Sequence, residues 1–272
     1  MEYFASIDQG TTSSRFIIFD ENGNVVDQHQ IEFTQYFPDE NSVEHDPGEI
    51  WDTIVKCVKE VSKRFDIKKI KSIGITNQRE TTIAWSKSTG KPFYNAIVWQ
   101  DTRTQDICDE ILLDDSIKSD LYRTGLPVAT YFSLSKIIWL IRNVPTIKKS
   151  LTNNDVIFGT VDTWLIYKLT GTFQTDVTNA SRTLMFDIES LQWNENILKK
   201  YNIPIDSLAE IKPSLSNFGS SNNLLKDIPI TAVMGDQQAS LFGQHCFTKG
   251  KVKNTYGTGC FALTNTGEDI VY

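Results

Sequence analysis

Residues 7–15 read IDQGTTSSR and lie between two short apolar runs. A glycine lets the backbone approach a ligand closely, and successive N–H groups with nearby hydroxyls can form an anion-binding concavity. Asp8, at the end of a predicted strand, could hold hydrated Mg²⁺, and Arg15 could balance phosphate charge. Taken alone, the stretch is nevertheless more typical of a polar hairpin in which Asp8 forms an Asx turn.

Three further stretches place polar or aromatic side chains where apolar segments end. Arg79 and Glu80 supply a donor fork and an acceptor pair suited to neighbouring hydroxyls of a polyol, although surface ion pairs of little energetic value are commoner. Trp99 could face a carbon backbone, although a core tryptophan is the default. Asp236 follows an apolar strand and precedes a helix, where its ionised form is favoured. A base for phosphoryl transfer and a simple N-cap fit Asp236 equally well.

Other phosphate and metal motifs are excluded. The sequence has no G-x-x-x-x-G-K-[ST] motif, so it is not a P-loop protein. Residues 257–262 (GTGCFA) satisfy the bare G-x-G-x-x-A pattern, but a strand-like alternation follows instead of the helix that a dinucleotide site needs. The three histidines are dispersed and no Cys pair has zinc spacing, so a zinc site is not expected and the cysteines are expected to be reduced core thiols.

Composition narrows the function classes further. The chain has 272 residues, 40% of them hydrophobic, and a net charge of -7 without a Lys/Arg block. Nucleic acid and anionic membranes are therefore not expected partners. The N-terminus lacks a basic region followed by an apolar one, and the densest apolar cluster, 137–141, is too short to span a bilayer. The sequence predicts a soluble, cytoplasmic protein.

The elements that must position these residues begin with a three-strand antiparallel meander over 3–7, 15–20 and 25–33. A helix follows, with Asp46 as cap, Pro47 at its first position and Glu49 completing a capping box. The next strand covers 69–76. Further strands are predicted at 82–85, 96–99 and 230–234, and helices at 104–113, 133–142, 160–169 and 237–243. Residues 214–226 are predicted to form a surface loop or a small excursion, and 253–263 a hairpin similar to the first. The pattern indicates an α/β domain with a mixed sheet and flanking helices.

Together these stretches resemble the glycerol kinases of the FGGY carbohydrate-kinase family, in the actin/Hsp70/sugar-kinase superfamily with its RNase H-like domains. The matching segments are DQGTTSSR (8–15), EHDPGEIW (44–51), GITNQRETT (74–82), YNAIVWQDTRT (94–104), YFSLSKIIWL (131–140), FGTVDTWLIYKLTG (158–171), TNASRTLMFDI (178–188), GDQQASLFGQ (235–244) and NTYGTGCFALTNTGE (254–268). NQRET at 77–81 separates glycerol kinases from xylulokinase-like relatives.

The resemblance implies a role for each matching residue. It implies transfer of the γ-phosphoryl of ATP to glycerol, giving sn-glycerol 3-phosphate, with Asp236 as the base and Asp8 at the Mg²⁺. The glycerol pocket would contain Arg79, Glu80, Trp99, Tyr131, Asp236, Gln237 and Phe261. The nucleotide phosphates would lie against Thr11, Thr12, Ser13, Arg15, Thr258 and Gly259.

The resemblance also implies a domain division. Residues 1–250 match the first RNase H-like domain, and 251–272 match only the opening strands of a second one that holds the adenine in the family. Two interpretations stay open: a truncated or split kinase, and an inactive remnant or glycerol-binding module. A homo-oligomer or a separately encoded C-terminal half is the protein partner to consider.

Overall fold

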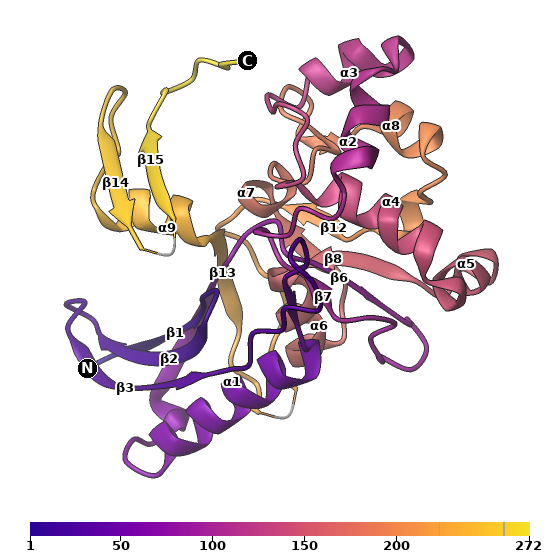
Figure 1. Cartoon of the computed structure of the whole chain (residues 1–272). Coiled ribbons are helices and arrows are strands. Elements are labelled where there is room, and N and C mark those ends of the chain that lie inside the picture. The colour runs from indigo at the N-terminus through magenta and orange to yellow at the C-terminus, as the bar shows by residue number, and fades with distance from the viewer. Residues whose placement is uncertain (223, 258) are drawn as a thin grey trace.

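The computed structural model describes residues 1–222, 224–257 and 259–272, and a five-stranded mixed sheet forms its centre (Figure 1). The strand order is β13-β5-β1-β2-β3. The strands are β1 (Tyr3–Gln9), β2 (Ser13–Asp20), β3 (Val25–Glu32), β5 (Ile70–Asn77) and β13 (Ile230–Gly235). The first three form the predicted antiparallel meander, whereas β5 is parallel to β1 and to β13. The predicted α/β class with a mixed sheet is confirmed.

One face of this sheet is buried by helix α1 (Pro47–Ser62) and helix α6 (Val161–Thr170). Strand β2 alternates, with Ser14, Phe16 and Ile18 buried, as expected for a sheet with one covered face. Trp164 of α6 is buried and its Nε1 donates a hydrogen bond to the Pro47 carbonyl at 2.9 Å, which ties the two helices together.

Helix α1 starts where the sequence predicts, but only half of the predicted capping box forms. Asp46 accepts a hydrogen bond from the Gly48 N–H at 2.7 Å, and Pro47 is the first helical residue. Glu49 does not reach back to Asp46. Its Oε1 instead accepts from the N–H and hydroxyl of Thr34, at 3.1 and 3.0 Å, because the chain after β3 brings these two donors to the helix.

A second core lies beside the first, around a four-stranded sheet of order β4-β7-β6-β8. Figure 1 shows its helices gathered on the side of the molecule opposite the meander. The strands are β4 (Glu44–His45), β6 (Thr82–Trp85), β7 (Ala96–Ile97) and β8 (Ile157–Thr160). The helices are α2 (Gln105–Leu112), α3 (Lys118–Tyr122), α4 (Ser133–Asn143), α5 (Pro145–Thr152) and α8 (Glu195–Lys200).

The remaining elements are short and include the C-terminal hairpin. They are β9 (Gln174–Asp176), α7 (Val177–Ala180), β10 (Phe186–Asp187), β11 (Gln192–Trp193), β12 (Glu210–Lys212), α9 (Asp236–Gly243), β14 (Val252–Tyr256) and β15 (Cys260–Thr264), with 3-10 turns η1 (Ile67–Lys69), η2 (Asp115–Ile117) and η3 (Ile205–Ser207). Strands β14 and β15 pair antiparallel, which confirms the predicted second hairpin. Thr258, predicted as a phosphate ligand, lies outside the described residues.

Two sequence-based expectations are wrong in part. The segment 214–226 is not simply a surface loop, because Phe218 and Leu225 are fully buried in the first core. The four cysteines, all described, are free, but Cys260 is exposed because it lies on the open hairpin, whereas Cys57, Cys108 and Cys246 are buried. Among the helices that the structure describes, none is long and apolar enough to cross a membrane.

The interior strand β5, between β13 and β1, contributes buried side chains to the first core. Ile73 is fully buried there, so Ile73→Ala should lower the free energy of unfolding by about 2–5 kcal/mol through lost transfer energy and a residual cavity. Val26 on the edge strand β3 is 45% exposed, and Val26→Ala should change stability by no more than about 0.5 kcal/mol. Urea unfolding followed by circular dichroism measures both. Equal effects of the two substitutions would contradict this assignment of the core.

Candidate active site

Parallel strand pairing brings three polar segments to one edge of the central sheet. Gln9 of β1 and Gly235 of β13 both pair with Asn77 of β5. The carboxyl ends of parallel strands meet at the same edge, where open α/β sheets bind ligands. The residues that follow these strands, at 10–13, 78–80 and 236–238, therefore start from adjacent points.

Helix α7 fixes two of these strand ends to each other. Asn179 exchanges side-chain hydrogen bonds with Asn77 at 3.0 and 3.2 Å, and the Thr178 hydroxyl accepts from the Gly235 N–H at 2.8 Å. The buried carboxylate of Asp176 caps α7 by accepting from the N–H groups of Thr178 and Asn179. The ends of β5 and β13 are thus held by one short, capped helix.

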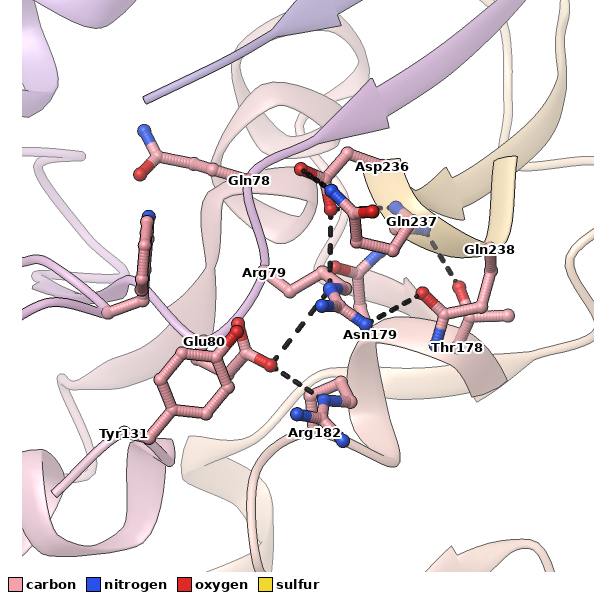
Figure 2. Close-up of polar contacts among 12 residues, drawn as sticks. Gln78, Arg79, Glu80, Tyr131, Thr178, Asn179, Arg182, Asp236, Gln237 and Gln238 are labelled. Atoms are coloured by element: carbon pink, nitrogen blue, oxygen red, sulfur yellow. Dashed lines mark hydrogen bonds and ion pairs between the residues drawn. The ribbon is translucent and has the colours of Figure 1, made fainter. Parts of the chain in front are cut away.

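A pocket of about 150 Å³ opens above these strand ends, and it collects every residue predicted to contact substrate. Figure 2 shows several of these side chains converging on one space from the ends of β5, from α9 and from the loop before α4. The lining residues are Thr11, Gln78, Arg79, Glu80, Trp99, Tyr131, Asp236, Gln237, Thr255, Gly257, Gly259 and Phe261.

Arg79 lies between the two carboxylates of the pocket. Its Nε is 3.2 Å from Asp236 Oδ1 and 4.0 Å from Glu80 Oε1, and its Nη1 donates to Gln238 Oε1 at 3.1 Å (Figure 2). Gly235 makes room for it, since a Cβ there would lie 2.7 Å from Arg79 Cδ. With 5% exposure for Arg79 and 1% for Glu80, the alternative of a surface ion pair is wrong.

Glu80 is held in an uncommon conformation. Its φ is +63°, in the left-handed region that non-glycine residues rarely adopt and that is often retained at functional sites. Burial raises the pKa of its carboxyl, and the positive charges of Arg79, Arg182 and Lys136 oppose that rise. The ionised form therefore depends on the surrounding cations.

Asp236 is the first residue of α9, and the N-cap position belongs to Gly235, so the N-cap interpretation of Asp236 is wrong. Its carboxylate accepts from the Gln237 N–H at 2.8 Å and from Gln237 Nε2 at 3.2 Å. Burial raises the pKa of this carboxyl, while Arg79 lowers it. On the other side of Gln237, the Lys253 ammonium donates to the side-chain oxygen Oε1.

Aromatic rings form the apolar wall of the pocket. Trp99 packs edge-on against Tyr131 and Phe261, with ring centroids 5.6 and 5.9 Å apart, so it is not a simple core residue. Its Nε1 donates to the Thr11 hydroxyl at 3.0 Å. The fully buried Lys136 donates to the carbonyls of Thr130 and Tyr131, which anchors the loop that carries Tyr131, and burial lowers the pKa of Lys136 to about 8.

The turn between β1 and β2 and the strand residues beside it present their groups in two directions. Ser14 points into the core, where its hydroxyl bonds Gln9 and Thr53, while Thr12 is exposed and Ser13 half-buried. Asp8 lies 3.8 Å from Arg15. Burial raises the pKa of Asp8, Arg15 lowers it, and the nearby charge of Asp236 raises it further. The pairing of β1 and β13 with β5 places Asp8 and Asp236 at the same edge of the sheet.

A buried histidine links this turn to the pocket. Gln78 Nε2 donates to the Gly10 carbonyl at 3.1 Å and approaches His45 Nδ1 at 3.4 Å, while His45 Nε2 lies 2.6 Å from Gln35 Oε1. An acceptor at Nδ1 and a donor at Nε2 match the neutral ring. Burial accordingly lowers the pKa of His45 to about 4.

Several residues of the site had no assigned role in the sequence interpretation. The polar segment 176–182 (DVTNASR) has a residue pattern typical of a short capped helix. Nothing in that pattern indicates that its side chains contact Asn77 and Glu80, which lie about one hundred positions earlier in the chain. The site residues without a role predicted from the sequence are Asp176, Thr178, Asn179, Arg182, Gln238 and Lys253.

Comparisons with known proteins agree with this geometry. The model of the FGGY family of carbohydrate kinases, N-terminal domain, matches residues 3–243. The chain is 51% identical to the glycerol kinase of Petrotoga mobilis over 279 residues, which cover 99% of this chain and 55% of that protein. It is also 51% identical to the glycerol kinase of Fusobacterium nucleatum over 282 residues, with 100% and 56% coverage.

Two solved structures of carbohydrate kinases also superpose on this chain. Plasmodium falciparum glycerol kinase with ADP superposes with a TM-score of 0.93 and 44% identity, covering 100% of this chain and 56% of that one. Gluconate kinase from Lactobacillus acidophilus superposes at 0.85 with 21% identity and shares the fold. The chain spans about half the length of the curated relatives it matches.

The neutral His45 ring makes stability depend on pH. Its pKa in the folded chain, about 4, lies below the ordinary value of 6.5, so proton uptake favours unfolding. The stabilisation that depends on the unprotonated ring is therefore fully present above pH 6.5. As the pH falls towards 4, the free energy of unfolding decreases by up to about 3 kcal/mol on this account. Urea unfolding between pH 7 and 4.5 should show a smaller pH dependence in His45→Gln than in the parent. Identical pH dependence would contradict a neutral buried ring.

Proposed function

The chain belongs to the FGGY family of carbohydrate kinases, and on this basis we propose that it carries the substrate pocket and first phosphate loop of an ATP-dependent glycerol kinase. The observation that carries the proposal is the single pocket that unites Arg79, Glu80, Trp99 and Asp236. The glycerol kinases that are about half identical to this chain support the choice of substrate.

The pocket offers both kinds of contact that a small polyol needs. Arg79 donates and Glu80 accepts hydrogen bonds, so adjacent hydroxyls of glycerol can be held by a matched pair. The rings of Trp99 and Phe261 supply an apolar wall for the carbon backbone. Tyr131 and Gln237 complete the polar lining.

Asp236 is the proposed base. It would accept the proton of the terminal hydroxyl as this oxygen attacks the γ-phosphorus of ATP. A pKa raised by burial favours proton uptake, and the Arg79 guanidinium at 3.2 Å keeps the carboxylate ionised beforehand. The two effects together suit a group that must be charged at rest and accept a proton in the transition state.

The phosphate groups of ATP would lie against the turn after β1 and the turn after β14. Hydroxyl and cationic donors come from Thr11 and Thr12 of the first turn and from Ser13 and Arg15 at the start of β2. Gly259 of the second turn lies close to the Phe261 ring. A Cβ at this position would be only 2.6 Å from the ring, so the turn needs a residue without a side chain here. Thr258 keeps its predicted role in this proposal.

Asp8 is the proposed protein ligand of Mg²⁺. No group of three or more His, Cys, Asp or Glu with metal-binding geometry exists in the described part of the chain. One or two carboxylates suit Mg²⁺, which keeps several waters and binds substrate phosphates. Asp8 is half-buried near the end of β1, and its carboxylate offers the oxygen donor that Mg²⁺ prefers, so the donor present fits this cation. The cation would neutralise charge on the transferring phosphoryl group.

We place the domain boundary at residue 250. The family match that ends at residue 243 supports this division, as does the hairpin β14–β15, which pairs with no other strand among the described residues. Residues 251–272 would then belong to a second domain. The turn after β14 in this domain would contact the phosphate groups of ATP beside the pocket.

Direct binding tests the substrate. Calorimetry should show glycerol binding to the 272-residue chain, and Glu80→Gln should weaken it by at least about tenfold, because a hydrogen bond to a charged group is lost. Glu110→Gln, which removes an exposed carboxylate paired with Arg142, is the matched control and should leave the affinity unchanged. Absence of binding by the folded parent chain would overturn the proposed substrate.

The role of Asp236 is tested by turnover. Asp236→Asn should lower glycerol 3-phosphate formation by at least about a thousandfold while the Kd for glycerol changes little, because the amide cannot accept the proton. A coupled assay with ATP and Mg²⁺ measures this, with and without a supplied C-terminal half of a glycerol kinase. Turnover within tenfold of the parent would refute Asp236 as the base.

A further inference from the structure

Arg182 approaches Glu80 more closely than any other cation does in the described part of the chain. It follows α7, and its Nε lies 2.6 Å from Glu80 Oε1 (Figure 2). Its guanidinium carbon lies 5.0 Å from the Phe132 ring centroid and 5.6 Å from that of Tyr131. The side chain is 22% exposed, so it is fixed between the aromatic rings and the carboxylate at the edge of the pocket.

The charge balance of the pocket requires a second cation. Two carboxylates, Glu80 and Asp236, share Arg79, which lies 3.2 Å from Asp236 and 4.0 Å from Glu80. Arg79 is therefore the closer partner of Asp236 and the more distant partner of Glu80. A carboxylate that is 1% exposed costs several kcal/mol to ionise without its own partner. Arg182 supplies that partner.

We propose that Arg182 is a positioning residue of the pocket, which holds the Glu80 carboxylate in place and in its ionised form, so that Glu80 meets the substrate as a hydrogen-bond acceptor. This inference rests on the proposed function, because the ligand is the polyol. An ionised carboxylate only accepts, whereas a protonated one must donate through one oxygen. By keeping Glu80 ionised, Arg182 thus determines that a substrate hydroxyl donates to Glu80 and does not accept from it.

The other charged groups around Glu80 cannot replace Arg182. Lys136 of α4 is fully buried and its ammonium already donates to the carbonyls of residues 130–132. Asp236 of α9 is itself an anion, and Tyr131 is a neutral phenol whose pKa burial raises. Among the described residues, Arg79 is the remaining cation beside Glu80 and also lowers its pKa, but its Nε lies nearer to Asp236, at 3.2 Å, than to Glu80, at 4.0 Å.

The backbone of Glu80 is held independently of Arg182. Its carbonyl accepts from the Ser133 hydroxyl at 3.1 Å and from the Thr82 hydroxyl at 2.9 Å. A substitution of Arg182 therefore leaves the left-handed conformation at Glu80 supported, and the effect should fall on the carboxylate.

Glycerol binding to the chain across pH 6 to 9 tests the inference. In Arg182→Gln the pKa of Glu80 rises, so the affinity should fall by at least about tenfold at pH 6 and recover to within about threefold of the parent at pH 9. Arg182→Lys keeps the charge and should lose less than Arg182→Gln at pH 6. Arg142→Gln removes an exposed partner of Glu110 and should change nothing. An equal loss at every pH, or no loss in Arg182→Gln, would overturn the proposal.

A second readout does not depend on glycerol. Titration of the Glu80 carboxyl carbon by ¹³C NMR, assigned with Glu80→Gln, should show a pKa at least about one unit higher in Arg182→Gln than in the parent. An unchanged pKa would overturn the role of Arg182 even if glycerol binds. If the parent does not bind glycerol but the pKa shifts as expected, the proposed substrate fails and the positioning role stands. If Arg182→Gln does not fold, the same titration in Arg182→Lys decides, with no rise expected beyond about half a unit and a larger rise counting against the proposal.

Discussion

The register of three parallel strands is the constraint on which the pocket depends. Asn77 pairs with Gln9 on one side and with Gly235 on the other, so the segments that follow these strands start side by side. Helix α7 fixes the same points from outside the sheet through Asn179 and Thr178. A slip of one residue in β5 would turn Arg79 and Glu80 away from Asp236, because side chains alternate along a strand.

Electrostatic compensation is the second condition, and it follows from the first. Bringing the strand ends together also brings Asp8, Glu80 and Asp236 into one half-buried region, where burial raises the pKa of each carboxyl. Arg15, Arg79 and Arg182 reach these carboxylates from three different parts of the chain. Each of these carboxylates thus has a cationic partner that opposes the cost of its burial.

Much of the fold could be predicted from the sequence, since its elements have strong local signals. The meander, β5, α1 and α9 follow from apolar periodicity and from turn and cap residues, and the structure shows them within a few positions of the predicted bounds. Signals that compete with tertiary contacts failed. Glu49 bonds Thr34 instead of completing a capping box, and Phe218 is buried although its neighbours are polar.

The sequence by itself determined which chemical groups are present and at which strand ends they lie, because these properties depend on local pattern. It also indicated the family, through long motifs in order. Only the tertiary structure decided whether Arg79 and Glu80 form a surface pair or a buried one, and whether Asp236 caps a helix or faces a pocket. It alone brought Arg182 to Glu80 across 102 positions. Contacts at such separation are set by sheet register and helix packing, which no local pattern specifies.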